Sequence, residues 1–173
     1  MSTPSASQIP IEEFKATLKL QSGDFEFKAN KINIVKSVDL SGNKCWTIKA
    51  FQEIFNDKGP TSDLTGIKEV IAIHLNIARE PIADNQQLLP AALPPALNKN
   101  SGSVFKIVDN IPDENNQIDT TENYPGDAGE ITYLWDELRT NITGTFSLRG
   151  KYADDYFLVF GSFNLLNRGQ HII

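Results

Sequence analysis

Two histidines and a single cysteine are the side chains of this sequence that act most readily as a general base or a thiol nucleophile near neutral pH. His171 is the third residue from the end, which leaves His74 as essentially the one candidate base for a Ser-His-Asp or Cys-His arrangement. The sequence contains no Gly-x-Ser-x-Gly, no glycine-rich phosphate loop and no His-Glu-x-x-His. We therefore expect a protein that is not an enzyme and has no catalytic residues.

The surroundings of His74 and Cys45 favour structural roles. Alternation places His74 with Asn76 on the more polar face of its segment, which predicts a solvated or hydrogen-bonded histidine, with a ligand or catalytic base as the alternative. Cys45 lies beside Trp46 in an apparent strand, which predicts a buried and inert thiol. A lone cysteine forms neither an internal disulfide nor a zinc site with several thiolates.

Carboxylates are concentrated in residues 109–130, which hold seven acidic side chains and no basic one. Oxygen ligands of this kind suit Ca²⁺, and Asp113, Glu114 and Asp119 are the residues to test first. The regular spacing of an EF-hand loop is absent. We expect a solvated acidic loop, with no metal and no cofactor, and a hydrolase built on loop carboxylates is the alternative.

The segment 79–102 holds four of the nine prolines, so it sustains neither a helix nor a strand ladder. Its leucines either tuck onto the sheet or form an apolar arm that docks on a protein partner or on a second copy of the chain. The candidate partner-binding residues are Leu88, Leu89, Leu93 and Leu97.

Charge and hydropathy exclude two classes of partner. The formal net charge is -6, and no cluster of basic and aromatic residues that could neutralise phosphates is present, so nucleic acid is not expected as a partner. No stretch approaches the roughly 20 apolar residues that span a bilayer. The opening MSTPSASQIP has no basic or apolar region of a signal peptide, which leaves localisation open between the cytoplasm and export by another kind of signal.

The elements that must position these residues are predicted by a hydrophobic period of two. It predicts an all-β fold: a single antiparallel sandwich or barrel of about eight strands over residues 11–168, with two long loops at 79–102 and 109–130. Residues 1–10 are predicted to be a flexible lead and 169–173 a tail. The pattern from residue 11 also permits one short helix before an extended segment that begins at Lys15.

The clearest strands lie in three places. Trp46, Ile48 and Ala50 share one face of a predicted strand, and residues 70–77 alternate in the same way. Ile131–Trp135 and Ile142–Leu148 form a predicted hairpin around a polar turn. Gly144 and Gly161 are predicted to mark a bend, a bulge or the close approach of a ring or backbone, and the last strand, 156–165, is apolar on both faces and expected to be covered on both sides.

The stretch GEITYLWDELRTNITGTFSL, residues 129–148, followed by GSFNL at 161–165, resembles the C-terminal signature of a family of uncharacterised bacterial all-β domains. In that family a Gly-x-Ile strand, an acidic turn, a Gly-Thr-Phe strand and a final Gly-x-Phe strand recur. Residues 27–51 are similar, more loosely, to the family's opening strands. The resemblance implies a closed or sandwiched sheet of calycin-like appearance and brings no catalytic residues. Members are commonly exported lipoproteins, whereas this chain has no lipid-attachment cysteine near its start.

Three functions are compatible with this sequence. We predict a non-catalytic interaction or assembly domain that uses the 79–102 loop, a sheet edge or the termini. The first alternative is a β-barrel that binds a small apolar or sugar ligand through Trp46, Tyr133 and Trp135. The second is an acidic inhibitor or immunity-type partner of a basic enzyme.

Overall fold

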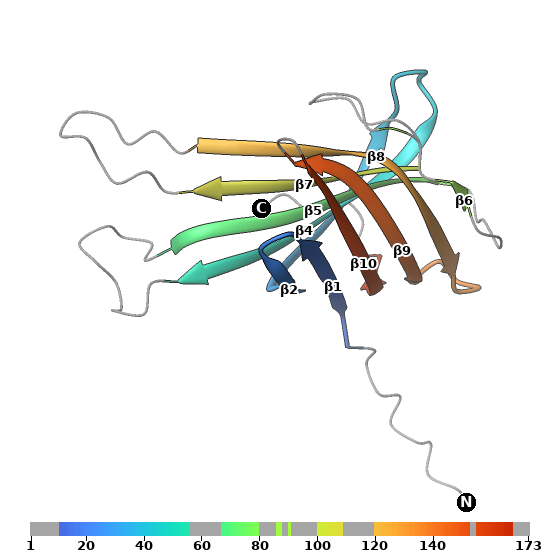
Figure 1. Ribbon diagram of the computed structural model, residues 1–173. Helices are drawn as coiled ribbons and strands as arrows, with labels where there is room; N and C mark the ends of the chain where they lie inside the picture. Colours follow the sequence, from blue (N-terminus) through green and yellow to red (C-terminus); the bar gives the residue numbers. More distant parts are fainter. Residues whose placement is uncertain are drawn as a thin grey trace, which may run out of the picture.

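The computed structural model describes residues 11–55, 67–79, 86–87, 90, 100–108, 120–152 and 155–167. These residues form strands and the turns between them, with no helix (Figure 1). In chain order the strands are β1 (Glu13–Leu20), β2 (Gly23–Lys28), β3 (Lys31–Val38), β4 (Lys44–Phe55), β5 (Ile67–Ala78), β6 (Gln86–Gln87), β7 (Ser101–Val108), β8 (Thr120–Trp135), β9 (Asn141–Tyr152) and β10 (Asp155–Leu166). The predicted all-β class is confirmed.

All neighbouring strands pair antiparallel, in the order β2-β1-β10-β9-β8-β7-β5-β4-β3, and the short β6 pairs with β8. The sheet is curled into a half-barrel, and β4, β5 and β7 run across the direction of β1, β9 and β10 (Figure 1). The long β8 belongs to both halves, since residues 120–125 pair with β7 whereas the residues from Gly126 onward pair with β9. The inner faces of the two halves face each other and form the core.

The first corner of the sheet lies in β8, where the register with β9 shifts between Gly126 and Ala128. A strand that carries a bulge bends and twists more strongly, which lets it pass from one half of the sheet to the other. Pro125 is the last residue of β8 that pairs with β7. A proline that donates no backbone hydrogen bond is tolerated at such a position, where one ladder ends.

The second corner is the two-residue connection Ala29–Asn30, which joins the outermost strands β2 and β3. Ala29 N donates to Phe14 O in β1, and Asn30 N donates to Phe51 O in β4, each at 2.9 Å. Two successive residues therefore bond to different halves of the sheet: Ala29 to the half that contains β1, and Asn30 to the half that contains β4.

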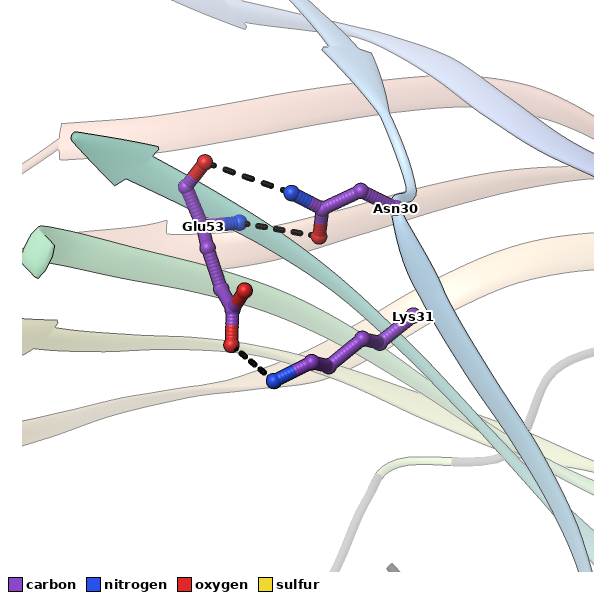
Figure 2. A network of polar contacts seen from close by, with 3 residues as sticks. All are labelled: Asn30, Lys31 and Glu53. Atoms are coloured by element: carbon purple, nitrogen blue, oxygen red, sulfur yellow. Dashed lines mark hydrogen bonds and ion pairs between the residues drawn. The ribbon is translucent and has the colours of Figure 1, made fainter. Parts of the chain in front are cut away.

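Side chains complete this corner (Figure 2). Asn30 Oδ1 accepts from Glu53 N at 3.2 Å, and Asn30 Nδ2 donates to Glu53 O at 3.4 Å, so one amide side chain satisfies both backbone groups of Glu53. Lys31 Nζ donates to the Glu53 carboxylate, and Lys28 N donates to Gln52 Oε1 at 2.9 Å. The backbone pairing of β3 with β4 ends at Lys31 and Phe51, and the Asn30 side chain extends these hydrogen bonds to Glu53, two residues further along β4.

Aromatic rings and glycines interlock where the core meets β9 and β10. Phe163 is the register partner of Gly144, and Phe146 is the register partner of Gly161. A Cβ atom at residue 144 would lie 2.5 Å from Thr132 O, and one at residue 161 would lie 2.8 Å from Lys15 O, besides meeting the facing ring. Of the three alternatives predicted for these glycines, the close approach of a ring and of backbone is the one observed. Phe14 packs against both rings, with centroids 5.5 Å from Phe146 and 6.0 Å from Phe163.

The predicted hairpin of Ile131–Trp135 and Ile142–Leu148, now the ends of β8 and β9 that meet at the polar turn, is also confirmed. Ile131 pairs with Phe146 and Trp135 with Ile142. In the polar turn between β8 and β9 the Asp136 carboxylate accepts from Thr140 N at 2.6 Å. Bonds from Thr140, the hydroxyl first, lower the pKa of Asp136.

Four expectations are corrected. The short helix allowed near residue 11 is absent from the described chain, because the extended pairing of β1 with β10 already begins at Glu13. Both predicted loops contain strand residues: within 79–102, Gln86–Gln87 form β6 and β7 begins at Ser101, and the 109–130 segment is strand from Thr120 onward. Backbone pairing on both flanks of β8 outweighs its polar composition. Nine strands form the described path, not eight, because the corner at Ala29–Asn30 divides β2 from β3.

The fourth correction concerns β10. Its inner face is buried as predicted, but Tyr156, Leu158 and Phe160 on the outer face are 56%, 40% and 47% exposed. β10 lies in the sheet between β1 and β9, and no described element packs on the outer face of this part of the sheet.

Candidate ligand-binding cleft

A half-open cleft of about 960 Å³ lies at one end of the curled sheet. Its walls come from the C-terminal ends of β1, β4 and β7, from the N-terminal ends of β2, β5 and β10, and from Tyr124 near the start of β8. In an antiparallel sheet these strand ends meet at the same edge. The cleft is therefore a product of the curled fold and is assembled from segments far apart in the sequence.

The floor of the cleft is apolar. Leu18, Ile71, Val104 and Phe157 line it and are all at most 9% exposed. Aromatic side chains add to the walls: Phe25 comes from β2, and the rings of Tyr124 and Phe157 meet edge to face at 6.3 Å. A concave apolar surface with few polar groups is the usual form of a small-molecule site.

A short polar row extends from the wall of the cleft along β5, β7 and β8. Lys106 Nζ lies 3.2 Å from Glu69 Oε1, and both side chains line the cleft. Lys106 is also the register partner of Glu122, whose carboxylate accepts a hydrogen bond from the Tyr124 hydroxyl. Side chains directly opposite on one face of an antiparallel pair are neighbours, so the row holds two carboxylates and one ammonium group.

The three aromatic residues predicted as ligand contacts lie elsewhere. Trp46, Tyr133 and Trp135 are 7%, 1% and 7% exposed, and none of them lines the cleft. The ring centroids of Trp46 and Trp135 are 5.8 Å apart at the other end of the interior. The Arg79 guanidinium carbon lies 5.3 Å from the Trp46 ring, where a cation–π contact is favourable. These residues fill the core.

The Tyr133 hydroxyl is held inside this end of the core. It lies 3.4 Å both from Ala78 O and from Asn100 Oδ1, and Asn100 in turn accepts from Ala78 N at 3.2 Å. Burial raises the pKa of Tyr133 well above its usual range, so the phenol stays neutral. A buried tyrosine with partners of this kind is a packing residue.

His74 lies on the outer face of β5 between two aromatic rings. Its ring centroid is 4.3 Å from that of Phe105 and 5.9 Å from that of Phe51. Burial, and then the nearby charge of Lys49, lower its pKa to about 4, and its Nε2 atom is buried with no hydrogen-bond partner. His74 is therefore half-buried between aromatic neighbours on β4 and β7, and its Nε2 atom is neither solvated nor hydrogen-bonded.

Cys45 is fully buried, as predicted, and its Sγ atom lies 3.4 Å from Asn43 O. Within the ranges given above, no group of three or more His, Cys, Asp or Glu side chains is placed to hold a metal ion. In the same residues no helix has the length and apolar character needed to cross a membrane. The predicted arm residues Leu88, Leu89, Leu93 and Leu97, the acids Asp113, Glu114 and Asp119, and His171 lie outside the described residues.

One feature of the sequence could have indicated the cleft: two charged residues lie on the apolar faces of their strands, near the strand ends. Glu69 shares a face with Ile71, and Lys106 shares a face with Val104. A charged side chain on the apolar face of a strand, at its end, indicates that this end opens to solvent. Such residues on several strands identify an open end only when the strand order is known.

Comparisons with protein-family models, with curated proteins and with solved structures found no match.

Proposed function

We propose that this protein is a non-catalytic binding domain that holds a small, largely apolar molecule in the cleft at the open end of its sheet. The observation that supports this proposal is the cleft of about 960 Å³ with its buried apolar floor. Ligand sites of this type commonly have volumes of roughly 300–1,000 Å³.

The proposed architecture is a flattened barrel of the calycin-like kind suggested by the sequence resemblance. Its support is the connection Ala29–Asn30, which bonds to both halves of the sheet and joins the two outermost strands. A barrel with one open end and a filled opposite end provides a single pocket for a ligand.

The test is the binding of Nile red, an uncharged apolar probe, to the full chain and to two tryptophan variants. Ile54 lines the cleft, whereas Phe55, the next residue, does not and is 54% exposed. We expect saturable binding of one probe per chain, and Ile54→Trp should weaken it about tenfold by occupying space in the cleft. Phe55→Trp should leave it unchanged.

Two results would refute this function. One is the absence of saturable binding to the unmodified protein. The other is an equal effect of both tryptophan variants, which would place the probe on the general surface. Far-ultraviolet circular dichroism of each variant checks that the sheet is intact.

The outer face of β10 supports self-association as a second function. Leu158 and Phe160 stand beside a hollow of about 350 Å³ that is also lined by Gly129, Glu130 and Arg149. The exposed side chains of Leu158 and Phe160 and the hollow lie on the same surface. In a dimer with two-fold symmetry, these two side chains of each copy can therefore enter the hollow of the other, and Arg149 of one copy can pair with Glu130 of the other.

Sedimentation velocity at increasing protein concentration tests this second function. We expect a dimer that Leu158→Asp converts to monomer. Val38→Asp is the matched control, because Val38 is 63% exposed on β3, away from this face. A wild-type chain that stays monomeric at high concentration, or a dimer that Leu158→Asp leaves intact, would contradict self-association through β10. The predicted docking role of the 79–102 loop stays a prediction.

A further inference from the structure

We infer that the ligand of the cleft is an organic cation, an apolar body with an ammonium or similar positively charged end. This inference rests on the proposed function, since it assigns the chemistry of a molecule bound in that cleft. Two features of the described residues support it: the charge of the polar row and the aromatic side chains that stand near it.

The polar row carries a net negative charge. Glu69 and Glu122 contribute two carboxylates, and Lys106 contributes one ammonium group between them. The Glu69 and Lys106 side chains are 21% and 35% exposed, so the row is partly withdrawn from water. Charges in such a place act on a bound molecule through a lower effective dielectric than bulk water provides.

The consequence differs for ligands of opposite charge. A carboxylate ligand gains from Lys106 only by displacing Glu69 from its ion pair, and it then leaves two protein carboxylates to repel it. A cationic ligand meets Glu69, which is already paired with Lys106, and lies near Glu122, which does not itself line the cleft but accepts a hydrogen bond from the lining residue Tyr124. Coulomb attraction therefore favours the cation.

The aromatic walls favour the same ligand. Phe25, Tyr124 and Phe157 line the cleft from three different strands. The faces of aromatic rings attract cations, and rings with a nearby carboxylate are the common surroundings of bound alkylammonium groups. The buried floor of Leu18, Ile71 and Val104 provides the surface for the apolar body.

The experiment compares three ligands that have the same ten-carbon chain: decyltrimethylammonium, decanol and decanoate, each below its micelle concentration. Calorimetry measures their affinities for the full chain at low and at physiological salt, with Nile red displacement as a check that they enter the same cleft. We expect the ammonium ligand to bind about tenfold more tightly than decanoate at low salt, with decanol between them and a smaller gap at higher salt.

Variants assign the preference to the row. Glu122→Gln should reduce the ratio of ammonium to carboxylate affinity several-fold. Glu137→Gln is the control: it removes the same charge, but from the exposed turn between β8 and β9, which does not line the cleft. Lys106→Met should raise the ratio, and a gain of preference cannot result from misfolding.

The outcomes separate the inference from the proposed function. If decanoate binds as tightly as the ammonium ligand while both displace Nile red, the cleft binds apolar molecules and the inference is wrong. If Glu122→Gln and Glu137→Gln change the ratio equally, the preference comes from the overall charge of the protein, and the inference is again wrong. If no ligand binds and Nile red is not displaced, the proposed function itself fails.

Discussion

The hydrogen atom that serves as the side chain of Gly144 leaves room for the Phe163 ring and for Thr132 O on β8. Gly144→Ala should lower the free energy of unfolding by about 1–3 kcal/mol, because the new methyl group would meet Thr132 O, a backbone atom that cannot rotate away. Urea denaturation measures the loss. Thr145→Ala is the control, since Thr145 is exposed on the outer face and should change stability by less than about 0.5 kcal/mol. Equal effects of the two variants would contradict the close packing described for residue 144.

A pH dependence follows from the aromatic enclosure of His74. The folded protein has a pKa of about 4 at this residue, against 6.5 for the free side chain, so between these values the unfolded state binds more protons. Stability is therefore lost as the pH falls from about 6.5 to about 4. At pH 5, protonation of His74 in the unfolded state lowers the free energy of unfolding by roughly 2 kcal/mol. His74→Leu should remove that part of the difference between pH 7 and pH 5 in urea denaturation.

Carboxylates also titrate below pH 5, so the His74 prediction concerns the difference between wild type and variant rather than the slope of either. An identical loss of stability in both proteins between pH 7 and pH 5 would show that His74 is free to take up a proton in the folded state.

At the scale of elements, the corner between β2 and β3 depends more on an amide than on an ion pair. Asn30→Ala removes both bonds to the backbone of Glu53 and should cost about 1–2 kcal/mol of unfolding free energy. Lys31→Met removes only a contact of a lysine that is 52% exposed, and should cost less than about 1 kcal/mol. Thermal and urea unfolding of the two variants compare them directly. A larger loss for Lys31→Met would mean that charge, not continuation of the ladder, holds the corner.

At the scale of the whole molecule, the two corners join both halves of the sheet into one cooperative unit. Cys45 is fully buried in this unit, so it should react with a thiol reagent such as DTNB only when the molecule unfolds. The labelling rate should follow the population unfolded by urea. A Val38→Cys variant in a Cys45→Ala background is the control, and it should react at once because residue 38 is 63% exposed. Rapid labelling of Cys45 in native buffer would show that β4 opens locally.

Alternation of apolar and polar residues was enough to predict the strand class and the inward face of most strands. Burial on one face imposes a period of two, so Ile48 and Ala50 were assigned to the same face from their neighbours alone, and both are fully buried. The hairpin between β8 and β9 followed from local order too, because its strands are adjacent in the chain and its turn is short. Gly144 was recognised because a glycine inside a strand weakens it unless something must come close.

Which strand ends meet, and therefore where the cleft forms, depends on long-range strand pairing. Glu69, Lys106 and Glu122 come from β5, β7 and β8, and they became neighbours through strand order and register, which alternation does not encode. The same limit explains His74, enclosed by rings from two other strands, and the outer face of β10, whose apolar pattern did not reveal that no described element covers it. Periodicity reports which side of a strand avoids water, whereas the cleft depends on how long-range pairing curls the sheet and leaves one end open.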